Sequence, residues 1–321
     1  MSSKTDLPSR TGSVETQAPA RSPNQVGSEK GRTVLNHTYG AQAVTRALGG
    51  QWRGYYGTAR CPVHNDRNPS LSISTGDDGK LLVNCHAGCA PLDVLAALRD
   101  RGISVTNEKP DAVGTIKKAE WRARQRARAV REWAKSSPIN RTLGERYLRS
   151  RAIQAPLPKT LRFNQLCWHP SGTRLAAIVA KVVGPKGHLG VHRTYLGPDG
   201  QKALVSPQKA MLGPIRGGAV HLSDGTGPLV VSEGIETALS ILDLNAMHSP
   251  RVWAALSASG VAGLELPSRP GKLIVAPDGD KAGRIAAEKL AERAHSLAWQ
   301  VSALNPPDGK DWNDVAMEVA S

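Results

Sequence analysis

Residues 272–280 have the sequence KLIVAPDGD, and residues 229–233 have the sequence LVVSE. Each is a continuous apolar run followed at once by carboxylates, which is typical of a buried parallel strand with acids at its carboxyl end. In open α/β sheets, ligands bind in the crevice beyond those ends. We therefore expect Glu233, Asp278, Asp280 and the later Asp311 to share a site. Carboxylates held so close stay ionised only around a cation, and a hard, oxygen-liganded ion such as Mg²⁺ fits them.

The chain around these acids alternates between strand and helix patterns, which predicts an α/β region with a mostly parallel sheet. Upstream, Leu175 to Val183 and Leu189 to Leu196 are short β-like runs separated by Gly and Pro turns. The elements expected after Gly227 are strand 228–232, helix 235–246, strands 252–256 and 272–277, helix 282–297 and strand 300–304.

Charge indicates the kind of partner. The 321 residues include 42 Lys and Arg against 27 Asp and Glu, a formal charge of +15. Nucleic acid is the leading partner for so basic a chain, although the charge could serve solubility alone. A helix is expected from about Ile116 to Lys135. Residues 117–151 hold twelve Lys or Arg against three Glu. This segment is either a solvated linker or a nucleic-acid contact.

Three of the four cysteines fall within residues 61–89, in the motifs Cys61-Pro-Val-His64 and Cys85-His-Ala-Gly-Cys89. Two β-rich runs around an Asp-Gly turn lie between the motifs and predict a hairpin, which brings both motifs together. Tetrahedral zinc suits this Cys/His set, so we expect a structural Zn²⁺ rather than plain buried cysteines. His86 is a competing ligand, and Cys167 is expected to be a core thiol.

These motifs resemble a known family. Cys61-Pro-Val-His64, with Asn68-Pro-Ser-Leu71 and the later cysteine pair, resembles the zinc-binding module of bacterial DnaG-type primases and, more closely, that of phage and plasmid primases. Residues 233–234 and 278–283 resemble the acidic motifs of the Toprim domain that primases share with topoisomerases and some nucleases. Residues 310–314 are similar to a later acidic motif of phage primases.

The resemblance implies a DNA primase, a nucleotidyltransferase that makes short RNA primers on single-stranded DNA in phage, plasmid or mobile-element replication. Its cofactors would be structural Zn²⁺ and catalytic Mg²⁺ or Mn²⁺, and its substrates nucleoside triphosphates. Asp278, Asp280 and Asp311 would hold the catalytic metal, and Glu233 would be a further ligand or the general base. The chain has no Gly-x-x-x-x-Gly-Lys-Ser/Thr loop, so we expect any replicative helicase to be a separate chain.

Several basic residues are candidates for contacts to nucleotide or template. Lys281 and Arg284 would begin the helix after the acidic pair, where a helix N-terminus favours phosphate. Arg193, Lys202 and Lys209 lie in the basic region before the Toprim motifs. Each could instead be an ordinary solvated surface charge.

Together these features predict a multidomain α+β and α/β protein, with a small zinc-binding hairpin module, a mixed α+β middle part and a Toprim domain. We expect it to be cytoplasmic, because no apolar stretch approaches the about 20 residues of a membrane span. The alternatives are a Toprim nuclease or topoisomerase-like enzyme, and a non-catalytic DNA-binding accessory protein. The expected segments are a disordered tail (1–33), the zinc module (34–105), a basic helical linker (106–140), the basic start of the catalytic core (141–225) and the Toprim domain (226–321).

Overall fold

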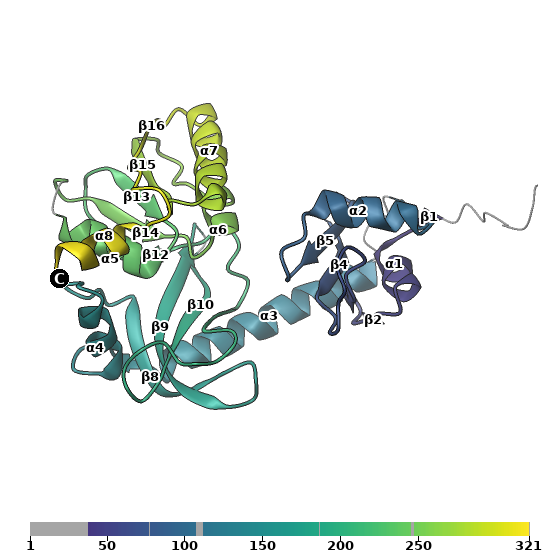
Figure 1. Cartoon of the computed structure of the whole chain (residues 1–321), viewed down its shortest axis with the longest axis horizontal. Coiled ribbons are helices and arrows are strands. Elements are labelled where there is room, and N and C mark those ends of the chain that lie inside the picture. Colours follow the sequence, from purple (N-terminus) through teal and green to yellow (C-terminus); the bar gives the residue numbers. More distant parts are fainter. Residues whose placement is uncertain (1–37, 77, 107–111, 186, 245–246, 321) are drawn as a thin grey trace, which may run out of the picture. The chain divides into compact units, whose positions relative to one another are not determined.

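The computed structural model describes residues 38–76, 78–106, 112–185, 187–244 and 247–320. The chain forms two compact units, residues 1–110 and residues 111–321 (Figure 1). The tail that we expect to be disordered, residues 1–33, lies outside the described residues. Within the described part of the chain, every helix is too short or too polar to span a lipid bilayer.

The first unit is built on a small antiparallel sheet with the strand order β2-β3-β4-β5. These strands are β2 (Gln51–Trp52), β3 (Tyr56–Ala59), β4 (Leu71–Thr75) and β5 (Leu81–Cys85). Around the sheet lie α1 (Ala41–Ala47), α2 (Pro91–Asp100) and the parallel pair β1 (Thr38–Tyr39) and β6 (Ser104–Val105). β4 and β5 form the predicted hairpin, and Leu71 lies opposite Cys85. Leu71, Ile73 and Leu98 are fully buried in the core of this unit.

The second unit begins with an antiparallel sheet in the order β11-β10-β9-β8-β7. Its strands are β7 (Ser137–Pro138), β8 (Leu161–Trp168), β9 (Arg174–Gly184), β10 (Gly187–Leu196) and β11 (Lys209–Leu212). The helix α3 (Ala112–Ala134) contacts β10 and β11, while α4 (Leu143–Ser150) contacts β8 and β9. On β10, Val191 and Tyr195 are buried in one cluster with Ala129 of α3. The alternation of side chains along a strand then places His192 and Thr194 on the opposite face.

The rest of the second unit contains a five-stranded sheet in the order β12-β14-β13-β15-β16. The strands are β12 (Val220–His221), β13 (Leu229–Ser232), β14 (Arg251–Ala254), β15 (Lys272–Ala276) and β16 (Gln300–Ala303). All its pairings are parallel except that of β12, so the predicted fold class is confirmed. The helices are α5 (Ile235–Asp243), α6 (Ala258–Ala262), α7 (Lys281–Ser296) and α8 (Trp312–Val319).

Both faces of this parallel sheet are covered, as an all-apolar strand requires. Leu229 and Val231 of β13 are buried in one cluster with α7 residues. Val230 is buried on the other side, in a cluster with α5. That second cluster also holds Leu161 and Ile178 of the antiparallel sheet. The two sheets of the second unit therefore share a continuous core, which fixes the acids of one near the bases of the other.

Most element ends differ from the expected ones by one or two residues. The basic helix begins earlier, at Ala112, and α5 ends at Asp243 rather than at residue 246. β14 ends at Ala254, and Leu256 beyond it has a positive φ of 74°, which leaves the extended conformation of a strand. The helices without a counterpart among the expected elements are α4, α6 and α8, and the strands without one are β1, β2, β3, β6, β7, β8, β11 and β12.

Candidate active site and metal centre

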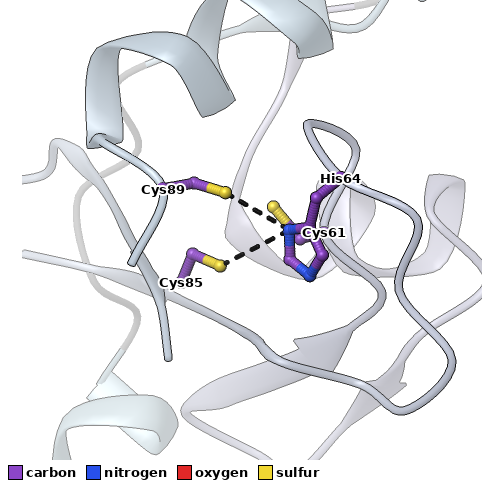
Figure 2. A group of neighbouring side chains, drawn as sticks. All are labelled: Cys61, His64, Cys85 and Cys89. Atoms are coloured by element: carbon purple, nitrogen blue, oxygen red, sulfur yellow. Dashed lines mark hydrogen bonds between the residues drawn. The ribbon is translucent and has the colours of Figure 1, made fainter. Parts of the chain in front are cut away.

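The four zinc-ligand candidates of the first unit converge on one point (Figure 2). Cys61 and His64 precede β4, Cys85 ends β5, and Cys89 lies just before α2. Their ligand atoms all lie within 4.8 Å of one another. Tetrahedral zinc with Zn–S of about 2.3 Å separates its ligands by roughly 3.5–4 Å, so a small inward movement completes the set. Gly88 turns the chain between the last two ligands with φ of 96°.

A carboxylate behind this group holds the first ligand loop in place. Asp66 Oδ2 accepts hydrogen bonds from the backbone N–H of Cys61 at 2.8 Å and from that of Ser70 at 3.0 Å. The Ser70 hydroxyl also donates to it, and these hydrogen bonds lower the pKa of Asp66 to about 2. His86 is exposed and lies 2.9 Å from the Ser72 hydroxyl, so it is engaged outside the ligand group. The geometry favours Cys61, His64, Cys85 and Cys89 as the four ligands.

Two of the predicted acids come just after the carboxyl ends of adjacent strands, and those strand ends lie side by side in the parallel sheet. β13 and β15 pair directly, with Ser232 opposite Ala276. Glu233 follows Ser232 at once, and Asp278 follows Ala276 after a single proline. Both carboxylates therefore lie at the carboxyl edge of the sheet, where the fold class places ligands.

A close backbone contact brings the third acidic segment to this edge. The Gly279 N–H donates to the Lys310 carbonyl at 2.8 Å, and the Gly309 N–H donates to the Gly279 carbonyl at 2.9 Å. A Cβ on Gly279 would lie 2.5 Å from the Pro307 carbonyl oxygen and 2.6 Å from that of Lys310. Glycine is needed here because the two loops touch backbone to backbone, which carries Asp311 to the site.

The acids repel one another, and the resulting rise in pKa is largest at Asp278. Burial raises the pKa of Asp278, and the neighbouring negative charges bring it to about 7; they belong to Glu233, Asp311 and Asp280. Its Oδ1 is buried without a hydrogen-bond partner among the described residues. Burial likewise raises the pKa of Glu233, with a contribution from Asp280. A buried oxygen in a field of like charge is what a divalent cation would stabilise.

The acids are nevertheless more widely spaced than the zinc-type ligands. Among the residues described, the Cys/His group is the one set of three or more metal-ligating side chains close enough to hold an ion directly. This spacing fits Mg²⁺, which keeps several waters and takes only one or two carboxylates directly. The donor set, all carboxylate oxygen with one unpartnered member, is that of a hard cation.

Asp280 and Asp311 also begin helices. Asp280 is the N-cap of α7, and its Oδ1 accepts from the Gly283 N–H at 2.7 Å. Asp311 is the N-cap of α8, and its Oδ1 accepts from the Asn313 N–H at 2.7 Å. Each carboxylate thus uses one oxygen for its helix, and its other oxygen is available to a cation.

The predicted basic residues divide between two places. The Lys209 ammonium lies 3.2 Å from a carboxylate oxygen of Glu236, and that of Lys202 lies 3.7 Å from the other oxygen. Burial and the neighbouring acids raise the pKa of Glu233 and of Asp278, and the charge of Lys209 offsets a small part of that rise, so this ammonium lies near the acids. Arg193 lies on the other face of the sheet and donates to the carbonyls of Trp168 and Met211.

Glu236 lies one position inside α5, and the structure shows what it holds. It is 7% exposed and accepts a hydrogen bond from the Tyr147 hydroxyl at 2.9 Å. Burial opposes its ionisation, but Lys209 and Lys202 outweigh burial and lower its pKa to about 2. The motif Glu233-Gly-Ile-Glu236 could have suggested this role, since the second glutamate falls one position inside a helix whose other face is core.

Lys281 and Arg284 lie in the first turn of α7. Both are exposed, and Arg284 donates to the Gly279 carbonyl at 2.9 Å and to Asp308 at 3.1 Å. Arg284 therefore supports the acidic loop, and Lys281 remains the candidate for a phosphate.

The comparisons with known proteins divide the second unit close to the boundary between its two sheets, although β12 of the second sheet falls within the first match. Residues 123–222 match a domain of unknown function, DUF7146. Residues 228–321 match a Toprim domain, and they include all four predicted acids. This segment is a Toprim domain. The Toprim domain predicted from residues 233–234 and 278–283 is thereby confirmed. No curated protein matches the chain.

The chain also resembles solved primase structures, at low identity. The Aquifex aeolicus primase (zinc-binding and RNA polymerase domains) shares 16% identity with a TM-score of 0.41, covering 86% of this chain and 79% of that one. The RNA polymerase domain of the Mycobacterium tuberculosis primase DnaG shares 18% with a TM-score of 0.40, covering 61% and 80%. The primase fragment of the bacteriophage T7 primase-helicase shares 19% with a TM-score of 0.35, covering 58% and 70%.

Proposed function

We propose that this protein is a DNA primase that synthesises short RNA primers on single-stranded DNA by metal-dependent nucleotidyl transfer. The observation that carries the proposal is the buried, unpartnered Oδ1 of Asp278 among the acids of the Toprim domain. Its pKa of about 7 indicates a site that is incomplete without a cation. Nucleotidyl transfer is the chemistry that combines such a site with a basic, nucleic-acid-binding chain.

The residues of the chain have separate tasks in this proposal. Asp278, Asp280 and Asp311 would hold Mg²⁺ or Mn²⁺, which when bound neutralises triphosphate charge and favours attack by the 3′-hydroxyl. Glu233 would be a further ligand or the proton acceptor, since its raised pKa suits either role.

Two lysines would meet the triphosphate. Lys209 faces the acids and is 38% exposed, so its ammonium is accessible to a nucleotide. Glu236 holds Lys209 and Lys202 in place, so that little side-chain entropy is lost when phosphate binds. Lys281, exposed at the start of α7, would take another phosphate.

The zinc module supports priming over other Toprim chemistry. Cys61, His64, Cys85 and Cys89 would bind a structural Zn²⁺ and so stabilise a module that helps to select the template site. By the resemblance stated above, this module and a Toprim domain occur in that order in phage and plasmid primases. The helicase would then be a separate chain, and single-stranded DNA and nucleoside triphosphates would be the partners in the cytoplasm.

A topoisomerase-like reaction is less well supported, because it needs an accessible tyrosine nucleophile. The unit that holds the acids has two tyrosines, Tyr147 and Tyr195, and both are buried. Tyr147 donates to Glu236, and Tyr195 donates to the Trp168 carbonyl at 2.9 Å. Burial raises the pKa of both hydroxyls. Cleavage by metal-bound water, as in a nuclease, remains the reaction to test against priming.

One assay separates these reactions. The full chain is incubated with single-stranded DNA, labelled ribonucleotides and Mg²⁺ or Mn²⁺, and the products are resolved by length. We expect short RNA oligomers from the wild type, and at least about a hundredfold less from Asp278→Asn. Glu292→Gln, which removes an exposed acid from the far part of α7, should retain synthesis. DNA cleavage without oligomers would support the nuclease instead, and binding without either product would support an accessory protein.

A further inference from the structure

A second basic site lies in the same unit, on the face of the antiparallel sheet that is turned away from the acids. It is a pocket of about 230 Å³ between α3 and the strands β8, β9 and β10. That volume is several times the about 30 Å³ that one water occupies, so a phosphate group fits. The cations on its wall are Arg128, Arg131, Lys135, Arg174 and Arg193.

Arg193 forms the base of this pocket and is the main reason to assign it a ligand. The side chain is only 5% exposed, and its two terminal nitrogens donate to the carbonyls of Trp168 and Met211. Its Nε is buried with no hydrogen-bond partner in the part of the chain that is described. A buried guanidinium with an unused donor is costly unless an anion completes it.

The cations around Arg193 are not neutralised by the protein. Arg128, Arg131, Lys135 and Arg174 are exposed, and none has a carboxylate within 4 Å among the described side chains. The pocket wall has one carboxylate, Glu132, and that carboxylate accepts a hydrogen bond from Asn164. The pocket therefore has five cations and one carboxylate, which is already hydrogen-bonded. This excess of positive charge attracts a polyanion.

The position of the pocket separates it from the reaction. Arg193 lies on the α3 face of β10, with Val191 and Tyr195. Its neighbour His192 lies on the other face, where burial and then the nearby charge of Lys209 lower its pKa and Glu236 partly offsets them. A group bound beside Arg193 is thus on the opposite side of the sheet from the acids and is not the reacting triphosphate.

One aromatic side chain indicates the class of polyanion. Trp168 is 43% exposed at the pocket, and the Arg174 guanidinium lies 5.9 Å from its ring centre. An exposed indole among arginines suits unpaired bases and their phosphates, which stack and pair with these groups without sequence preference. A free phosphate would use the arginines but not the indole.

We propose that this α3 pocket binds the phosphate backbone of single-stranded DNA away from the catalytic acids. The choice of DNA as the polyanion rests on the proposed function, whereas the anion site itself does not. The helix α3 would then be a nucleic-acid contact, one of the two roles that its composition allows, rather than a solvated linker.

Binding without synthesis tests this pocket. Fluorescein-labelled dT20 is titrated with the full chain by anisotropy, with no nucleoside triphosphates present, at several salt concentrations. Arg128→Gln/Arg131→Gln removes two pocket cations, and Lys117→Gln/Arg122→Gln removes two exposed α3 cations outside the pocket. We expect the pocket variant to weaken the Kd about tenfold and to reduce the salt slope by about 1.4, at about 0.7 per phosphate contact.

The control variant has the same net charge as the pocket variant and should bind within about twofold of the wild type. Equal weakening by both variants, or none by the pocket variant, overturns the assignment, provided that circular dichroism shows both folded. The proposed function can fail while this site stands. If the chain makes no primers but the pocket variant alone loses dT20 binding, the binding site is supported and the priming reaction is contradicted.

Discussion

Asp278 is the residue at which the Toprim site is least satisfied by the protein alone. Its pKa of about 7 compares with an ordinary value of about 3.9. A carboxyl whose pKa is higher in the folded than in the unfolded state lowers stability as pH rises between those two values. The penalty is therefore absent below about pH 4 and complete above about pH 7, and a bound cation would offset it.

This penalty gives the first prediction. Asp278→Asn, without added Mg²⁺, should be more stable than the wild type by about 1–2 kcal/mol at pH 8, because solvent screening reduces the full linkage at this half-buried site. The gain should shrink toward pH 5. Urea unfolding at both pH values measures it, and Asp308→Asn, at a side chain 97% exposed, is the control. A gain that does not depend on pH would contradict the assigned cause.

Gly279 gives the second prediction, which concerns the loop contact that brings Asp311 to the site. Gly279→Ala places a Cβ 2.5 Å from the Pro307 carbonyl oxygen, so the loops must separate. We expect a loss of about 1–3 kcal/mol in stability. Synthesis should fall more than tenfold, because a shift of about 1 Å at a catalytic site is enough for such a loss. Gly271→Ala is the matched control, since its Cβ would meet only Trp299 at 3.9 Å.

At the scale of elements, apolar runs and turn residues predicted the parts that lie deepest. β13 and β15 are found within one residue of the expected strands, because a central parallel strand must be apolar on both faces. The β4–β5 hairpin was predictable from its Asp-Gly turn, and it brings the cysteine motifs together. Local pattern and tertiary packing agree at these places.

Other elements depend on contacts that a single sequence does not reveal. The short helix α6 and the two-residue strand β2 are too brief to show a period. α8 begins at Trp312, and its N-cap Asp311 forms a capping box with Asp314 that the interpretation of Asp311 as a metal ligand did not anticipate. The part-buried pairing of Glu236 with Lys209 joins residues 27 positions apart. The place of Arg193 on the far face depends on the register of β10.

The β4–β5 hairpin gives the third prediction, at the scale of the element. The full chain should contain about one zinc per chain, and Cys61→Ser should lose it together with the cooperative unfolding of the first unit. Cys167→Ala should retain zinc, because Cys167 is buried in the core of the second unit. Atomic absorption and calorimetry measure both properties. Full zinc content in Cys61→Ser would contradict the ligand set.

At the scale of the molecule, the two units separate selection from chemistry in the proposed function. The acids, their lysines and the α3 pocket all lie within residues 111–321, and the zinc ligands all lie within residues 1–110. The boundary between the units passes through residues 110–111, just before α3.

This division gives the fourth prediction. A chain that begins at Asp111 should extend a supplied RNA primer on a DNA template with Mg²⁺ at a rate within about tenfold of the full chain. It should start new primers far more weakly, because the template-selecting module is absent. Gel analysis of extension and of initiation on the same template measures both rates. Equal rates of initiation by the two chains would contradict the proposed role of the zinc module in selecting the template site.

The two N-cap carboxylates connect the site to the backbone in a way that can be followed directly. Asp280 and Asp311 hold the amides of Gly283 and Asn313, and any cation or nucleotide that engages their remaining oxygens also changes how firmly those amides are held. Amide hydrogen exchange depends on such local opening. Deuterium uptake at Gly283 and Asn313 can therefore follow the filling of the site in a chain that has turned over no substrate.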